Sequence, residues 1–169
     1  MTFQSDKRWS DRFMRKIKSL IGQVLLSEAP DREDKSHNTD LVVFKMNSVR
    51  IGCRIRRHEY KKYYGQFTIR AGRPSGAKTE LAKIIEGWGD FFFYGFASVD
   101  GETVSDWWLC DLNVFRLWFM RQIYKCQPLK MPGEIRNNQD NSSSFVAFNM
   151  QELPAEFVVA SSRDGIEYA

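Results

Sequence analysis

Residues that bind metals or form disulfides are scarce in this sequence. It has three cysteines, Cys53, Cys110 and Cys126, and two histidines, His37 and His58. The cysteines are far apart, odd in number and include no CxxC pair, which argues against a structural zinc site and a disulfide framework. Both histidines stand among polar residues, so a catalytic pair built on histidine is not expected.

Long apolar runs are also missing. Residues 1–8 contain no apolar signal region, and no stretch approaches the roughly 18 apolar residues that a membrane span requires. We therefore expect a cytoplasmic protein that has no membrane partner. The low cysteine content fits a reducing compartment.

Hydrophobic residues, by contrast, are abundant. They make up 43% of the 169 residues and include 13 Phe, 6 Tyr and 5 Trp. A chain of this length and composition can bury its own core, so we expect a single domain over 1–169 with its core at about 10–125. We also expect a mobile, low-complexity loop at 137–144, and a C-terminal strand and tail over 145–169. The net charge of +4 permits nucleic acid as a partner without requiring it.

Three stretches have the spacing of helices that bury one side. The first, over 13–26, has a basic outer side that is either solvated or in contact with phosphate. The second follows a turn at 72–76, with Ser75 as a candidate cap and a buried stripe expected to be Leu81, Ile84, Ile85 and Trp88. The third begins after Asp111, which can cap it.

Strict alternation from Val49 to Arg56 predicts a half-buried strand. Its apolar positions fall on one side, and Arg50, Arg54 and Arg56 fall on the other. Residues 66–70 repeat the pattern, with Arg70 on the polar side. If these two strands pair, their arginines form one cationic sheet face, which is either solvated or binds anions.

The connections beside these strands add further cations. The candidate nucleic-acid-binding residues are Arg50, Arg54, Arg56, Lys61, Lys62, Arg70, Arg73 and Lys78. Tyrosines interleave with Lys61 and Lys62, a pattern that suits stacked bases and equally suits a loop that buries its rings. Replacing Arg54 and Arg56 together by alanine is expected to weaken binding with little loss of thermal stability.

The remaining apolar runs predict further strands at 41–44, 91–99, 104–110 and 145–148. The expected fold is α/β, with a central mixed sheet of about five strands and flanking helices. The order over 13–99 is helix, strand, strand, strand, helix, strand, and Thr39-Asp40 opens the first strand.

This order resembles the core of the PD-(D/E)XK nuclease-like superfamily, which occurs in restriction endonucleases, resolvases and many phage proteins. The resemblance implies a restriction-endonuclease-like core. It also implies a divalent metal held by an acid at a strand start and by an acid-x-lysine on the next strand. In that chemistry the metal activates water and the lysine positions the nucleophile.

The sequence departs from that pattern at the acid-x-lysine position. Arg54-Ile55-Arg56 stands there, or Thr68-Ile69-Arg70 one strand later, and neither contains a carboxylate. Gln66 is the nearest polar substitute, and it carries no charge. The resemblance leaves Asp40 and Glu80 as candidate ligands and catalytic residues, with Lys83 as the candidate lysine.

Three functions follow from these observations. The favoured one is a DNA- or RNA-binding protein on a nuclease-like fold that does not cut and needs no cofactor. The second is a magnesium-dependent phosphodiesterase that uses Asp40, Glu80 and Lys83. The third is a protein-interaction module, such as a phage-type inhibitor or accessory factor. It is motivated by the aromatic surplus, including the adjacent Trp107 and Trp108.

Overall fold

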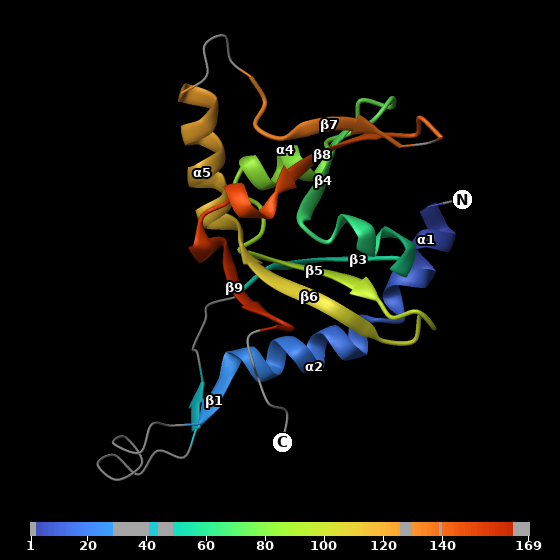
Figure 1. Ribbon diagram of the computed structural model, residues 1–169, viewed down its shortest axis with the longest axis vertical. Helices are drawn as coiled ribbons and strands as arrows, with labels where there is room; N and C mark the ends of the chain where they lie inside the picture. Colours follow the sequence, from blue (N-terminus) through green and yellow to red (C-terminus); the bar gives the residue numbers. More distant parts are fainter. Residues whose placement is uncertain (1–2, 29–40, 44–48, 126–129, 139, 164–169) are drawn as a thin grey trace.

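The most apolar stretch of the sequence forms strand β5, Phe91–Ala97, at the centre of the molecule (Figure 1). Six of its seven residues are buried. Successive side chains of a strand point to opposite faces, so a strand buried at nearly every position needs a cover on both faces. The other elements are arranged to provide these covers.

The computed structural model describes residues 3–28, 41–43, 49–125, 130–138 and 140–163. The elements, in chain order, are α1 (Phe3–Asp11), α2 (Met14–Leu25), β1 (Leu26–Glu28), β2 (Leu41–Val43), β3 (Ile51–Arg56), the 3-10 helix η1 (His58–Tyr63), β4 (Gln66–Gly72), α4 (Glu80–Ile85), β5 (Phe91–Ala97), β6 (Val104–Asp111), α5 (Leu112–Lys125), β7 (Glu134–Asn137), β8 (Ser144–Asn149), the 3-10 helices η2 (Met150–Glu152) and η3 (Ala155–Phe157), and β9 (Val158–Ser161).

The α/β class and the mixed sheet are confirmed, but the strands are divided between sheets. The main sheet has four strands in the order β3-β5-β6-β9, not about five. In it β3 runs parallel to β5, and the other pairs are antiparallel. A second, antiparallel sheet has the order β4-β8-β7, and β1 pairs with β2 alone.

The two arginine-bearing strands do not pair, so the single cationic sheet face that their pairing would give does not form. Strand β3 pairs with β5, and β4 pairs with β8, where Phe67 lies opposite Phe148 and Ile69 opposite Val146. The physical reason lies in β5, which is apolar throughout and takes a central position with a partner on each edge. Parallel strands need a long crossover, and the segment between β3 and β5 is that crossover. It carries β4 away into the second sheet.

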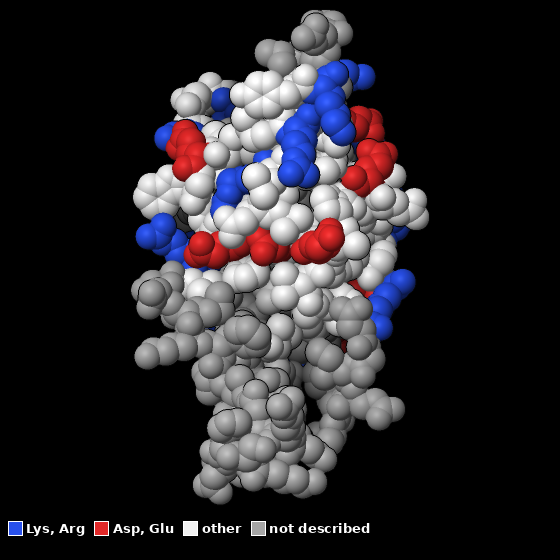
Figure 2. All heavy atoms as spheres, turned by 90° about the vertical axis from the view of Figure 1, so that its left-hand side faces the viewer, with Lys and Arg blue, Asp and Glu red and all other residues white. Residues whose placement is uncertain are grey.

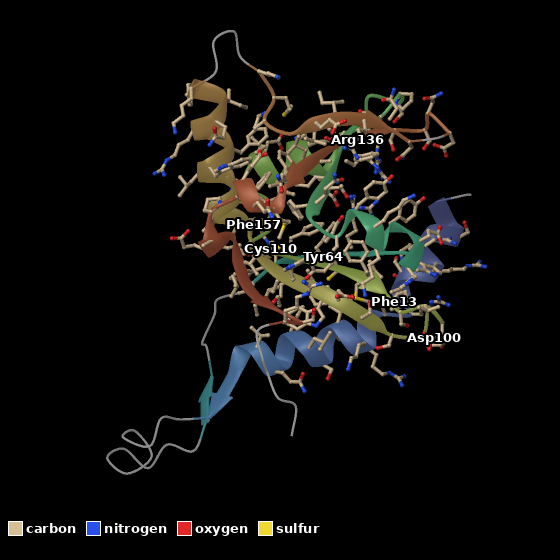
Figure 3. The ribbon with its side chains drawn as sticks, in the orientation of Figure 1. Phe13, Tyr64, Asp100, Cys110, Arg136 and Phe157 are labelled. Atoms are coloured by element: carbon tan, nitrogen blue, oxygen red, sulfur yellow. The ribbon has the colours of Figure 1, made fainter. Side chains whose placement is uncertain are left out.

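Two hydrophobic cores cover the two faces of the main sheet. Below it, Phe13, Ile17 and Leu20 of the α1–α2 corner and α2 pack against Phe93 and Trp107 (Figures 1 and 3). The buried side of the helix predicted over 13–26 is therefore confirmed. Helix α1, which precedes it, was not expected.

Above the sheet, the second sheet, α4 and α5 enclose the larger core. The ring of Phe67 on β4 lies within 5.1–6.4 Å of five other rings, counted between centroids. Phe157, at the foot of α5 in Figure 3, is one of these five. Trp107 and Trp108 point to opposite faces of β6, and both are buried because each face is covered.

Helix α4 is shorter than its sequence pattern predicted. Thr79, not Ser75, is its cap and accepts a hydrogen bond from the backbone N–H of Ala82. The helix ends at Ile85, and Gly87 and Gly89 have φ values of 95° and 82°. Trp88 therefore does not continue the buried stripe, as was expected, and is 58% exposed.

The predicted cap of the third helix and the predicted strand at 145–148 are confirmed. Asp111 caps α5 by accepting hydrogen bonds from the backbone N–H groups of Asn113 and Val114. The strand expected at 145–148 is β8, and the low-complexity stretch joins it to β7, which was not expected. The turn expected at Asn47-Ser48 lies outside the described residues.

Gly22 provides a test of the position of α2. It lies inside the helix, and an added Cβ would meet no atom within 4 Å. We expect Gly22→Ala to raise the free energy of unfolding by about 0.5–1 kcal/mol, because glycine loses more backbone entropy in a helix than alanine does. Urea denaturation measures this change.

Gly76 is the matched control. It also has open space around it, but its φ is 68°. Gly76→Ala is expected to lower stability, because an L-residue in the left-handed region is strained. An equal gain in stability at both positions would contradict the placement of Gly22 in a regular helix.

Candidate nucleic-acid interface

Arg54 lies between the two sheets and is bound at both ends of its guanidinium. Its Nη1 donates to the backbone oxygen of Thr68 at 2.8 Å, and its Nη2 pairs with Oε2 of Glu80. The same carboxylate accepts a hydrogen bond from the backbone N–H of Arg70 at 3.2 Å. Both side chains of the ion pair are mostly buried, with exposures of 23% and 28%. Arg54 thus ties β3 to β4 and α4.

Arg56 is also used inside the protein. Its Nη1 donates to the hydroxyl of Tyr94 at 3.3 Å, and that hydroxyl shares a 2.9 Å hydrogen bond with Thr68 Oγ1. Its Cζ lies 4.8 Å from the ring centroid of Tyr60 and 5.8 Å from that of Tyr63. These are cation–π distances. The interleaved tyrosines of η1 therefore hold a neighbouring arginine.

Three of the other six predicted nucleic-acid-binding residues have the partners that follow. Lys61 pairs with Asp106 at 2.6 Å, Lys78 pairs with Glu86 at 2.7 Å, and Arg50 Cζ lies 5.5 Å from the Trp88 ring centroid. The remaining three are spread out. Lys62 lines a shallow polar cavity beside Gln66, Arg70 lies on β4 and Arg73 is exposed in the turn after β4. The eight residues do not form one cationic face.

The candidate catalytic residues are only partly placed. Asp40 lies outside the described residues. Glu80 is held by Arg54, and Lys83 is exposed on α4. Within the described ranges, no three or more His, Cys, Asp or Glu side chains are grouped so that they could hold a metal ion.

A different set of exposed cations lies on the first two helices and the corner between them. We name it the N-terminal basic surface: Arg8, Arg12, Arg15, Lys16 and Lys18. Residues 3–25 hold six Lys or Arg against two Asp, so this segment has a net charge of +4, equal to that of the whole chain. No ion pair within the described ranges involves these five residues; nearby, Asp11 pairs with Lys7 at 2.8 Å.

Aromatic stacking extends this surface toward η1. The Cζ of Arg12 lies 5.5 Å from the ring centroid of Trp9, and the Cζ of Arg57 lies 5.2 Å from the same ring. Tyr60 on η1 is partly exposed. The alternation of residues 49–56 drew attention to β3, whereas the concentration of charge in the first helices was the better indication of exposed cations without an ion-pair partner among the described residues.

Comparison with protein-family models, with curated proteins and with solved structures finds no match to this chain. Among the helices that the structure describes, none has both the length and the apolar character needed to cross a membrane.

The Arg54–Glu80 pair leads to a prediction that reverses the one made from the sequence. Arg54→Met leaves the carboxylate of Glu80 and the oxygen of Thr68 without this donor, so we expect a loss of about 2 kcal/mol in stability. Glu80→Gln alone is also expected to destabilise. The double variant is expected to lose less than the sum of the two, because the residues act on each other.

Urea denaturation of the four proteins measures that coupling. Arg73→Met is the control, because Arg73 is an exposed arginine in the turn between β4 and α4, the helix that carries Glu80. It is expected to change stability by less than about 0.5 kcal/mol. Additive losses for Arg54→Met and Glu80→Gln would contradict a pair that joins β3 to α4.

Asp106 joins η1 to the C-terminal part of the chain. It contacts Lys61 at 2.6 Å and Arg163 at 3.9 Å. Burial on its own would raise the pKa of Asp106. Hydrogen bonds from Lys61 and Ser105 and the charges of Lys61 and Arg163 outweigh burial and lower the pKa below its ordinary value.

This shift predicts a pH-dependent effect of Asp106→Asn. A carboxyl whose pKa is lower in the folded state stabilises the fold above its unfolded pKa of about 3.9, and this stability is lost as the pH falls through the folded pKa. We expect the variant to be less stable by about 1 kcal/mol at neutral pH. The difference should narrow as the pH falls below about 4. Denaturation midpoints measured across this range test the prediction, and a difference that does not depend on pH would contradict it.

Proposed function

We propose that this protein binds nucleic acid through its N-terminal basic surface and does not cut it. The observation that carries the proposal is the concentration of the chain's net charge in residues 3–25, on a surface whose cations have no ion-pair partner among the described residues. The phosphate backbone attracts such a surface regardless of sequence, and released counterions favour binding.

The geometry of α2 supports a backbone contact. Its buried stripe of Phe13, Ile17 and Leu20 fixes the rotation of the helix on the sheet. Arg15 and Lys18, three residues apart, therefore share the opposite side. A helix anchored along its apolar side and cationic along the other can lie against a row of phosphates without exposing the core.

The stacked residues beside α2 support nucleic acid over other polyanions. Trp9 lies near the guanidinium groups of both Arg12 and Arg57. Arginine and aromatic side chains that are close together contact both phosphates and unpaired bases. This arrangement favours a partner that has charge and flat aromatic groups in the same polymer.

The proposal that cleavage is absent rests on the environment of Glu80. At the acid-x-lysine position of the resemblance stand Arg54 and Arg56, and Arg54 is paired with Glu80, the candidate metal ligand. A carboxylate bound by a guanidinium is a poor ligand for magnesium, which binds through free carboxylates and its own waters. The proposal of a nuclease-like fold rests on chain order: after α2 come the three expected strands β2, β3 and β4, and then α4 and β5, with β1 as an additional strand before β2.

Charge neutralisation at matched positions tests the proposed surface. The variant Arg8→Gln/Arg15→Gln/Lys18→Gln removes three exposed cations from it, and the control Arg73→Gln/Lys83→Gln/Lys130→Gln removes three exposed cations elsewhere. Fluorescence anisotropy with labelled duplex DNA, single-stranded DNA and RNA would be measured between about 50 and 200 mM salt.

We expect the first variant to bind at least about tenfold more weakly, and its salt slope on duplex DNA to fall by about 0.9 for each phosphate that the variant no longer neutralises. The control is expected to keep both within a factor of about two. Equal losses in the two variants would contradict a localised surface, and the absence of binding by the intact protein at low salt would contradict the function itself.

A cleavage assay separates the proposal from the nuclease alternative. We expect the purified protein, supplied with magnesium or manganese, to leave DNA and RNA uncut. Metal-dependent cleavage that disappears in Asp40→Asn and Glu80→Gln, with binding retained, would show that the protein is an enzyme.

A further inference from the structure

Helix α5 has large apolar side chains on its outer side as well as on its inner side. Leu112, Phe115 and Phe119 are buried in the upper core. On the outer side Leu117, Met120 and Tyr124 are 62%, 38% and 73% exposed. These three residues are spaced three and four apart, so they form one line along the helix. A helix that is apolar on two sides is normally covered on both.

The charges on α5 itself all have one sign. The sequence of α5 contains Arg116, Arg121 and Lys125 and no Asp or Glu. Arg116 is held inward, because its Nη1 donates to the backbone oxygens of Ile84 at 3.3 Å and Gly89 at 3.1 Å. Arg121 and Lys125 are exposed and point to no partner among the described ion pairs.

The space-filling view shows the surroundings of α5. Figure 2 looks onto the side of the molecule where α5 lies in Figure 1: Lys and Arg side chains gather on the upper part of that face, and Asp and Glu side chains lie beside and below them. In Figure 1, α1 lies on the opposite side of the molecule from α5, and α2 lies below the main sheet, whereas α5 stands at the upper left. The outer side of α5 is therefore a different surface from the two helices that carry the N-terminal basic surface.

We propose that the outer side of α5 binds an acidic amphipathic helix of another protein. The partner's apolar stripe covers Leu117, Met120 and Tyr124, and its flanking Asp and Glu pair with Arg121 and Lys125. Many proteins recognise a partner by packing the apolar side of one amphipathic helix against an apolar surface. The side chains that make the contact are then spaced at i, i+3 and i+7 along the helix. Opposite charges at the rim set the choice of partner.

The charge argument selects this occupant over two others. A second copy that docked α5 against α5 would bring Arg121 and Lys125 close to their own counterparts, and α5 supplies no acid to offset them. Nucleic acid would use the two cations and leave the three apolar side chains in water. An acidic amphipathic helix satisfies both the apolar line and the cations.

Selection from a library of displayed helical peptides tests the proposal. The peptides would carry randomised residues on a fixed helical frame and would be selected on the intact protein. Counter-selection would use Leu117→Ser/Tyr124→Ser, in which only exposed residues change, so that the fold is retained and can be verified by circular dichroism.

We expect the selected peptides to carry an apolar stripe with flanking Asp and Glu, and to bind the counter-selection variant at least about tenfold more weakly. Arg121→Glu/Lys125→Glu is expected to reverse the preference toward peptides with flanking Lys. Val99→Ser, at an exposed apolar residue in the turn between β5 and β6, serves as the control and should leave binding unchanged.

Three outcomes would overturn the proposal. One is selection that yields no peptide dependent on Leu117 and Tyr124, or peptides without acidic flanks. Another is a concentration-dependent dimer in sedimentation that is absent in Leu117→Ser/Tyr124→Ser, because it would assign the surface to a second copy. The third is a drop in nucleic-acid affinity in Arg121→Glu/Lys125→Glu that matches the drop in the N-terminal variant.

Discussion

The burial of strand β5 on both faces is the constraint on which the rest of the structure depends. Alternate side chains of a strand point to opposite sides, so Phe93 faces α2 and Tyr94 faces the second sheet. Each layer is therefore needed to keep aromatic surface out of water. The same constraint explains why Arg56, on the neighbouring strand, is used within the protein. The hydroxyl of Tyr94 is buried, and it accepts a hydrogen bond from the guanidinium of Arg56 besides the one that it shares with Thr68.

The sequence predicted individual elements better than it predicted their neighbours. Alternation at 49–56 and apolar character at 91–99 identified β3 and β5 correctly, because these patterns are local. Which strand lies beside which depends on how distant apolar surfaces match, and alternation contains no information about that. The assignment of Trp88 to a buried stripe failed for a related reason. Helical spacing was extended past Gly87, where the backbone leaves the helix.

The same difference between patterns within one segment and contacts between distant segments appears at the candidate site. Arginines aligned on one strand indicate a polar side correctly, but they do not reveal whether a carboxylate from elsewhere will meet them. Glu80 lies 26 residues beyond Arg54 and reaches it because α4 packs on β4. The charge of α1 and α2, in contrast, could be evaluated from composition alone. A surface helix keeps its outer residues exposed wherever the chain turns next.

The order of strands in the main sheet has a consequence for how the chain folds. Its two outer strands are joined to the inner ones by long segments that contain the second sheet and most of the helices: Arg50 meets Asp90 across 40 residues, and Trp107 meets Ser162 across 55. Such distant contacts are formed only after costly loop closure, so we expect this chain to fold more slowly than proteins with local pairing. During synthesis, the sheet lacks its last strand until Val158–Ser161 has emerged from the ribosome. Until then the edge of β6 and the aromatic side chains beside it are open to chaperones and to other nascent chains.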